Sequence, residues 1–94
     1  MIRVLIERRL IANIDTIAHD AFRGIRHEAI KKPGYISGET LRDANDPSHY
    51  VVISSWNSRE HWNAWASSEE RRQADEQIQS LLAEPEKITV LEPA

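Results

Sequence analysis

Hydrophobic and polar residues alternate at the start of the chain and then change to a helical period. Residues 2–10 alternate in the manner of a strand with one buried face. Residues 15–31 repeat with a helical period, Asn13 or Asp15 is suited to cap that helix, and Pro33-Gly34 ends it. The apolar face of the predicted helix comprises Ile14, Ile17, Ala18, Ala21, Phe22, Ile25 and Ala29.

Two further strand patterns follow, with turn-forming residues between them. Residues 35–41 and 50–56 are predicted strands, and Asn45-Asp46-Pro47 between them has the chemistry of a turn. Because the connection is short, the two strands are expected to pair as an antiparallel hairpin.

The last third of the chain predicts two helices and a final strand. A short helix has Asn57 or Ser58 as its cap, and Ser67-Ser68-Glu69-Glu70 starts a longer helix that reaches about residue 83. Pro85 ends the longer helix, and residues 87–91 form the last strand.

The order of these elements predicts the fold class. Strand, helix, strand, strand, helix, strand is the ferredoxin-like βαββαβ order, an α+β fold with a four-stranded antiparallel sheet and helices on one face. No internal repeat or linker interrupts the 94 residues, so residues 1–94 are predicted to form a single domain.

Apolar residues occupy both faces of the predicted sheet. Val51, Val52 and Ile53 are consecutive in a central strand, while Leu5 and Leu91 point away from the face that the helices cover. A second copy of the same sheet would bury these side chains, which predicts a homodimer packed sheet to sheet. The alternative is that these residues reflect β-propensity alone.

Composition narrows the class of protein. Twelve Lys and Arg against fifteen Asp and Glu give a net charge of −3, which argues against a nucleic-acid partner. The chain has no cysteine and no apolar run of the length of a membrane span, so we expect a cytoplasmic protein without a membrane partner. Nucleotide, zinc-protease and calcium motifs are also absent.

The spacing of the histidines does not match that of metal ligands. His19 and His27 lie two helical turns, or about 12 Å, apart on the predicted polar face, where solvated side chains are expected. His49 stands isolated at the start of a strand. We therefore expect no metal ion.

The three tryptophans, Trp56, Trp62 and Trp65, fall within ten residues, and His61 shares their side of the short helix. One interpretation is structural, because indoles can close the open end of a small sheet. The functional interpretation is an aromatic-lined pocket for a flat ligand.

Arg71 and Asp75 are the polar candidates for the rim of such a pocket. They lie four residues apart on the flanks of the apolar stripe of the longer helix. The alternative is a solvated charge ladder, as expected for Glu69, Arg72 and Glu76.

Several segments carry a resemblance to a known family. They are Pro33-Gly34-Tyr35-Ile36-Ser37-Gly38-Glu39, Tyr50-Val51-Val52-Ile53-Ser54-Ser55-Trp56, Ser58-Arg59-Glu60-His61-Trp62, and Trp65 with Ser68. Together they resemble the antibiotic biosynthesis monooxygenase family of dimeric α+β barrels. The family includes oxygenases of polycyclic phenols and quinols that use no metal or flavin, haem-degrading enzymes, and proteins without known activity.

The resemblance to the polyketide oxygenases of that family implies a catalytic role for Trp56. Those enzymes have an Asn in the third strand, a Trp four residues later and a Tyr six residues after that. In this chain Trp56 matches the Trp, whereas Val52 holds the Asn position and Trp62 the Tyr position.

The haem-degrading members imply a different set of residues. Trp65 matches their Trp on the short helix, while Arg8 stands at the Asn position and Asp75 at the position of the iron-ligating His. Because a carboxylate replaces the imidazole, the resemblance does not favour haem degradation.

The resemblance implies a cofactor-independent monooxygenase that acts on a small aromatic phenol or quinol, which would lie against the three tryptophans. His61 is the candidate base, because an imidazole titrates near neutral pH. The alternatives are a non-catalytic dimeric domain that binds a small ligand and, less favoured, a haem-binding protein.

Overall fold

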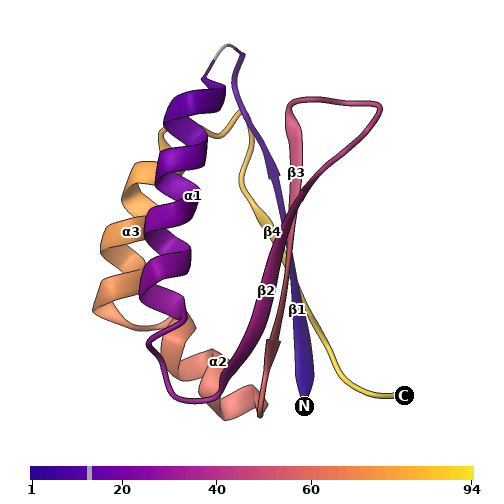
Figure 1. Ribbon diagram of the computed structural model, residues 1–94, viewed down its shortest axis with the longest axis vertical. Coiled ribbons are helices and arrows are strands. Elements are labelled where there is room, and N and C mark those ends of the chain that lie inside the picture. The colour runs from indigo at the N-terminus through magenta and orange to yellow at the C-terminus, as the bar shows by residue number, and fades with distance from the viewer. Residues whose placement is uncertain (13) are drawn as a thin grey trace.

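The computed structural model describes residues 1–12 and 14–94 of the chain. Figure 1 shows an α+β arrangement in which the helices lie on one side of a twisted sheet. Its elements in chain order are β1 (Ile2–Arg9), α1 (Asp15–Ala29), β2 (Tyr35–Arg42), β3 (His49–Trp56), α2 (Arg59–Ala66), α3 (Glu69–Gln79) and β4 (Lys87–Leu91).

The four strands form one antiparallel sheet in the order β2-β3-β1-β4. The central pair is held in register from Ile2 opposite Trp56 to Arg9 opposite His49. This is the ferredoxin-like arrangement, so the predicted fold class is confirmed, and the short and the longer helix predicted after β3 are α2 and α3.

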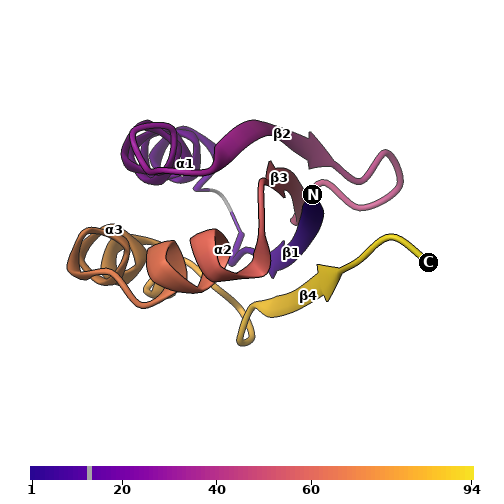
Figure 2. The same ribbon diagram turned by 90° about the horizontal axis from the view of Figure 1, so that it is seen from below.

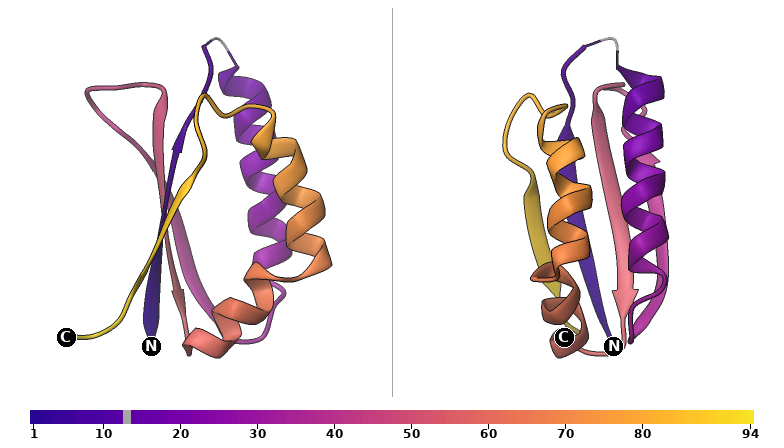
Figure 3. Two further views of the ribbon diagram at one scale, coloured as in Figure 1. Left: turned by 180° about the vertical axis from the view of Figure 1, so that it is seen from behind. Right: turned by 90° about the vertical axis from the view of Figure 1, so that its left-hand side faces the viewer.

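The helices cover a single face of the sheet. Viewed from the helix side, α1 and α3 lie next to each other, α1 in front of the β2 and β3 half and α3 in front of the β1 and β4 half (Figure 3). Seen from below, α2 leads from the end of β3 back to this helical layer (Figure 2). In the described ranges no helix combines the length and the apolar character needed to cross a bilayer.

The core forms where inward-facing strand residues meet the apolar stripes of the helices. Alternate residues of β1 are buried, because period-2 alternation directs every second side chain of a strand to the same face. Phe22 and Ile25 of α1 and Ile78 of α3 pack onto that face. Ile17 was expected in the same stripe but is 59% exposed, because α3 stops short of the first turn of α1.

Side-chain caps define the starts of two helices. The Ser58 hydroxyl accepts a hydrogen bond from the His61 N–H, and the Ser68 hydroxyl accepts one from the Arg71 N–H. Helix α1 has no side-chain cap of this kind at Ile14, and the alternative cap, Asn13, lies outside the described residues.

Two helices are shorter than predicted. Helix α1 ends at Ala29 rather than at residue 31. Helix α3 ends at Gln79 rather than near residue 83, because Leu82 bridges to Leu10 and the Ala83 N–H donates to the carbonyl of Arg9 at 2.7 Å. The chain therefore leaves the helix to pair with the end of β1.

The opposite face of the sheet has no helix over it. The strand register puts Leu5, Val51, Ile53 and Leu91 on that face, as predicted, and leaves Leu91 47% exposed. The β2–β3 hairpin curls toward the same side, away from the helices (Figure 1).

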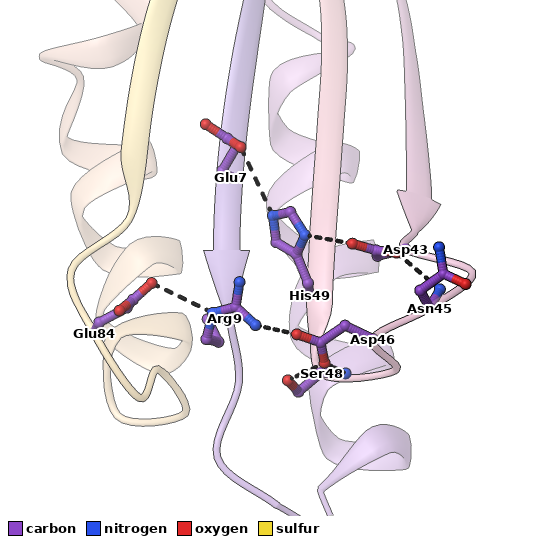
Figure 4. Close-up of polar contacts among 8 residues, drawn as sticks. All are labelled: Glu7, Arg9, Asp43, Asn45, Asp46, Ser48, His49 and Glu84. Atoms are coloured by element: carbon purple, nitrogen blue, oxygen red, sulfur yellow. Dashed lines mark hydrogen bonds and ion pairs between the residues drawn. The ribbon is translucent and has the colours of Figure 1, made fainter.

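Ion pairs join this hairpin to the strands beside it. Arg9 bridges Asp46 of the hairpin and Glu84, and the Asp46 carboxylate also accepts hydrogen bonds from Ser48 (Figure 4). Hydrogen bonds from Ser48 and then from Arg9 lower the pKa of the Asp46 carboxyl. These contacts hold the hairpin to the end of β1.

His49 is also part of the hairpin network, so the expectation that it stands alone was wrong. Its Nδ1 lies 3.1 Å from Oδ2 of Asp43, and its Nε2 lies 3.7 Å from Oε1 of Glu7 (Figure 4). The hydrogen bond from His49 is the largest cause of a lowered pKa of the Asp43 carboxyl. Strand pairing brings these residues together, because His49 begins β3 next to the end of β1.

Candidate functional site

A cavity of about 60 Å³ lies between the sheet and the helices. Strands β1, β2 and β3 form its floor, and residues of α1, α2 and the start of α3 form its roof. The lining is predominantly aromatic and aliphatic, with Trp56, Trp62 and Trp65 all contributing to it. A concave, mostly apolar space with a few polar groups is typical of a small-molecule site.

The three tryptophans are both core residues and cavity walls. Trp56 is 1% exposed, and its ring meets Tyr35 edge-on at 5.4 Å and Trp62 at 5.8 Å between centroids. Its indole N–H donates to Ser54 Oγ at 3.1 Å, so the buried nitrogen is satisfied. The indoles therefore close the core, as in the structural interpretation, and also line a cavity, which the functional interpretation requires.

A buried ion-pair group adjoins the aromatic walls. Arg8 Nε lies 2.9 Å from Oε2 of Glu86, and Arg71 Nη2 lies 3.3 Å from Oε1 of the same carboxylate. The three side chains are 2%, 6% and 10% exposed for Arg8, Arg71 and Glu86. Two guanidinium groups share the Glu86 carboxylate in a low-dielectric interior, and the charge of Asp75 also acts on Arg71.

Both arginines line the cavity and contact its aromatic walls. The guanidinium carbon of Arg8 is 5.4 Å from the centroid of Phe22, and that of Arg71 is 5.2 Å from the centroid of Trp62. Burial lowers the pKa of Arg71, and the charge of Glu86 opposes that shift. In the part of the chain that the structure describes, the Nη groups of Arg8 make no hydrogen bond, which leaves donors for a ligand.

The two polar residues predicted on α3 differ in position. Arg71 faces the cavity, whereas Asp75 does not line it. Asp75 Oδ2 accepts a hydrogen bond from Gln79 at 3.2 Å, and its charge favours the protonated form of Arg71. Its Oδ1 is buried without a hydrogen-bond partner among the described residues.

The structure does not bring His61 to the cavity. His61 Nδ1 lies 2.7 Å from the hydroxyl of Ser58, and the ring packs against Gly34 at the turn after α1. Gly34 has a φ of +84°, and a Cβ built there would lie 2.2 Å from His61 Cγ. His61 is therefore tied to the cap of α2 and to a turn that requires glycine.

Sequence reasoning did not assign Arg8 and Glu86 to the site. Arg8 carried a usable signal, because it follows Ile2, Val4 and Ile6 on the inward face of β1, where a charged residue is unexpected. Glu86 had no local signal, since it stands in the loop before β4 and meets Arg8 only through the tertiary fold.

The donor set of the cavity does not fit haem. The described lining contains no histidine, cysteine or methionine and does not include Asp75, and its one tyrosine, Tyr35, packs edge-on against Trp56 with its hydroxyl beside Gly38. The space is also small for a macrocycle. Across residues 1–12 and 14–94, no three His, Cys, Asp or Glu side chains gather in a way that could hold a metal ion.

The sequence profile of the antibiotic biosynthesis monooxygenase family matches residues 1–77 of the chain. The protein therefore belongs to this family. The cavity and its aromatic walls lie entirely within the matched residues, whereas Glu86 lies beyond them.

Solved structures share the fold at low sequence identity. The chain is similar to SnoaB, a cofactor-independent oxygenase from Streptomyces nogalater, with a TM-score of 0.86, 12% identity, and 99% of this chain and 93% of that chain covered. It is also similar to a conserved protein from Methanosarcina mazei, with a TM-score of 0.92, 13% identity, and 99% and 92% of the two chains covered.

Among curated proteins, the chain is similar to Protein SchA of Streptomyces halstedii. The two are 31% identical over 51 residues, which are 54% of this chain and 13% of that protein. The chain thus matches only a small part of the length of this relative.

Proposed function

We propose that the protein is a cofactor-independent monooxygenase that oxidises a small aromatic phenol or quinol. The observation that carries this proposal is the pairing of three indole walls with two buried arginines around one cavity. The indoles suit a flat ring, and the arginines suit an oxygen atom that becomes negative. Family membership and the fold shared with SnoaB support the same class of reaction.

The reaction needs no external reductant. For a phenol such as 1-naphthol, one atom of O₂ becomes a new ring carbonyl, and the other leaves as water with two substrate hydrogens. The substrate supplies all the electrons, and the product is the quinone. The role of the protein is to bind the phenolate, orient the ring toward oxygen and exclude water.

Arg8 and Arg71 are the groups proposed to stabilise the phenolate. Glu86 contacts both guanidinium groups, and the charge of Asp75 acts on Arg71 as well. A bound phenolate oxygen would add its negative charge beside the two guanidinium groups, in a site where electrostatic interactions are strong. Trp56, Trp62 and Trp65 are proposed to hold the ring.

The base that removes the phenol proton is proposed from sequence alone. His61 is the candidate, but the structure places it against Gly34 and Ser58 rather than in the cavity lining. A phenol bound beside two cations loses its proton more readily, because the positive charges lower its pKa. Loss of the proton from the bound phenol to solvent is therefore the route that does not need His61, and it is the one we favour.

The size of the cavity limits the substrate. A space of about 60 Å³ is far below the roughly 300–1,000 Å³ of typical ligand sites, so a ring must displace part of the wall. Its lining includes two exposed residues, Arg26 of α1 and Thr40 of the edge strand β2. Small one- or two-ring substrates are therefore favoured over larger ones.

A non-catalytic binding domain is the second candidate, and Val52 is the observation that favours it. Val52 lines the cavity where the resembling oxygenases carry Asn, and a valine side chain has no hydrogen-bond donor. Such a protein would bind the aromatic ring without reacting.

Oxygen uptake separates the two candidates. Binding of 1,4-naphthoquinone, a product analogue, is measured by quenching of the tryptophan fluorescence, and turnover of 1-naphthol by an oxygen electrode and quinone absorbance. Quenching with oxygen uptake supports the oxygenase. Quenching without uptake supports the binding domain, and the absence of both contradicts the two together.

We also propose that the helix-free face of the sheet packs on a second copy of the chain, as in the dimeric proteins that the family includes. Leu5 and Ile53 are neighbours across β1 and β3 at the centre of that face. Light scattering at micromolar concentration tests this, and a mass near one subunit would contradict it. A cytoplasmic location stays a proposal from composition.

A further inference from the structure

A groove of about 460 Å³ runs along the surface between α1 and the end of β2, outside the cavity. Its apolar floor includes Phe22 and Tyr50, and its polar walls come from α1 on one side and β2 on the other. His19 closes part of it, with Nε2 3.2 Å from the Tyr50 hydroxyl.

The groove and the cavity share part of their lining. Phe22, Arg26 and Thr40 line both of them, so we take the groove as the route from the surface to the indoles. A ligand whose ring lies among the tryptophans would extend any substituent on its outer end past Arg26.

The walls of this route are cationic. Among the described residues, Arg23, Arg26 and Arg42 line the groove without an Asp or Glu, whereas Glu39 of β2 lines the adjoining cavity. Arg23 pairs with Asp20, whereas Arg26 and Arg42 form no ion pair within the described residues. These two arginines are exposed on opposite walls, one on α1 and one on β2. The positive groove stands out on a chain whose net charge is −3.

We infer that the substrate is an aromatic carboxylate, bound with its ring in the indole cavity and its carboxylate in the groove between Arg26 and Arg42. This inference rests on the proposed function, because it names the class of ring compound that the same cavity takes. Guanidinium groups bind carboxylates through charge-assisted hydrogen bonds, which are stronger than neutral ones. The groove thus adds charge selectivity to a cavity that is otherwise selective for shape.

The test compares two probes of nearly equal shape. Calorimetry under anaerobic conditions measures the Kd of 5-hydroxy-1-naphthoate and of its neutral amide, 5-hydroxy-1-naphthamide. We expect the carboxylate to bind at least tenfold more tightly than the amide. In the double variant Arg26→Gln/Arg42→Gln this ratio should fall close to one, while the Kd of the amide stays within about twofold.

The matched control is Arg59→Gln/Arg72→Gln, which removes the same charge from exposed arginines outside the groove. The Kd ratio of amide to carboxylate should be unchanged in this variant. These arginines act on the ligand only by long-range electrostatic attraction, which salt screens.

Three outcomes overturn the inference. Equal binding of acid and amide by the unmodified protein rejects the carboxylate while the indole cavity of the proposed function stands. If the Kd ratio of amide to carboxylate is unchanged in the double variant, another group, such as Arg8 or Arg71, binds the carboxylate. Failure of both probes to bind rejects the proposed function together with the inference.

Discussion

The guanidinium of Arg71 lies over the ring of Trp62, its carbon 5.2 Å from the ring centroid. Arg71 belongs to the first turn of α3 and Trp62 to α2, so this contact fixes how the two helices meet above the cavity. The same guanidinium reaches the Glu86 carboxylate, which joins the aromatic wall to the buried ion-pair group. Residues that stabilise the fold are therefore also the ones proposed to bind the substrate.

Replacement of Glu86 should destabilise the protein strongly. Glu86→Gln leaves Arg8 and Arg71 buried without their counter-ion, which costs about 3–5 kcal/mol in comparable buried pairs. Urea unfolding measures the change in free energy. Glu84→Gln is the control, because that side chain is 62% exposed in its pair with Arg9, and a cost of about 0–1 kcal/mol is expected. Equal costs for the two variants would contradict the role of Glu86.

A carboxamide at Val52 should increase turnover. Val52→Asn puts a hydrogen-bond donor in the cavity wall, and one such donor at a developing oxyanion contributes about 10²–10³ in kcat elsewhere. We expect a gain of up to about 10² with 1-naphthol in the oxygen electrode. The buried amide should lower the free energy of unfolding by about 1–3 kcal/mol.

The control for this change is Val51→Asn, the preceding residue on the helix-free face. It should leave turnover unchanged. A Val52→Asn variant that folds and turns over no faster would show that no oxyanion develops near this wall, which favours the binding domain.

Loss of the His61 imidazole should have little effect on turnover. Because His61 lies outside the cavity lining, we expect kcat of His61→Ala to stay within a few-fold of the unmodified protein at every pH. A loss of about 10² or more, with loss of a pH dependence near neutrality, would instead establish His61 as the base.

The β2–β3 hairpin should loosen in acid. Because folding lowers the pKa of the Asp46 carboxyl, its contribution to stability is present above its unfolded pKa of about 4 and is lost as the pH falls through the lowered value. The difference in urea midpoint between the unmodified protein and Asp46→Asn should be constant from pH 7 to about 5 and shrink below about pH 4.

A second variant tests whether the hydrogen bond from Ser48 causes the pH dependence of stability at Asp46. Ser48→Ala removes one hydroxyl donor to Asp46, so it should reduce part of the same pH dependence. A midpoint difference for Asp46→Asn that does not change with pH would contradict this account.

The local patterns of the chain were sufficient for the fold class. Alternation in residues 2–10 and helical spacing in the following segment depend on neighbours a few positions apart, and both produced elements close to the predicted ones. The predicted end of α3 was wrong because Leu82 pairs with Leu10 instead of continuing the helix. No pattern within the helix sequence indicates that contact, because the two residues are far apart in the chain.

The sequence by itself determined the order of strands and helices, the apolar residues on both faces of the sheet, and the cluster of tryptophans. These follow from side-chain periodicity and from positions close together in the chain. Only the tertiary structure decided that Arg8, Arg71 and Glu86 meet beside the indoles, that His61 faces Gly34, and that Arg26 and Arg42 line one groove. The physical reason is distance along the chain, because strand pairing and helix packing set contacts between residues that share no local pattern.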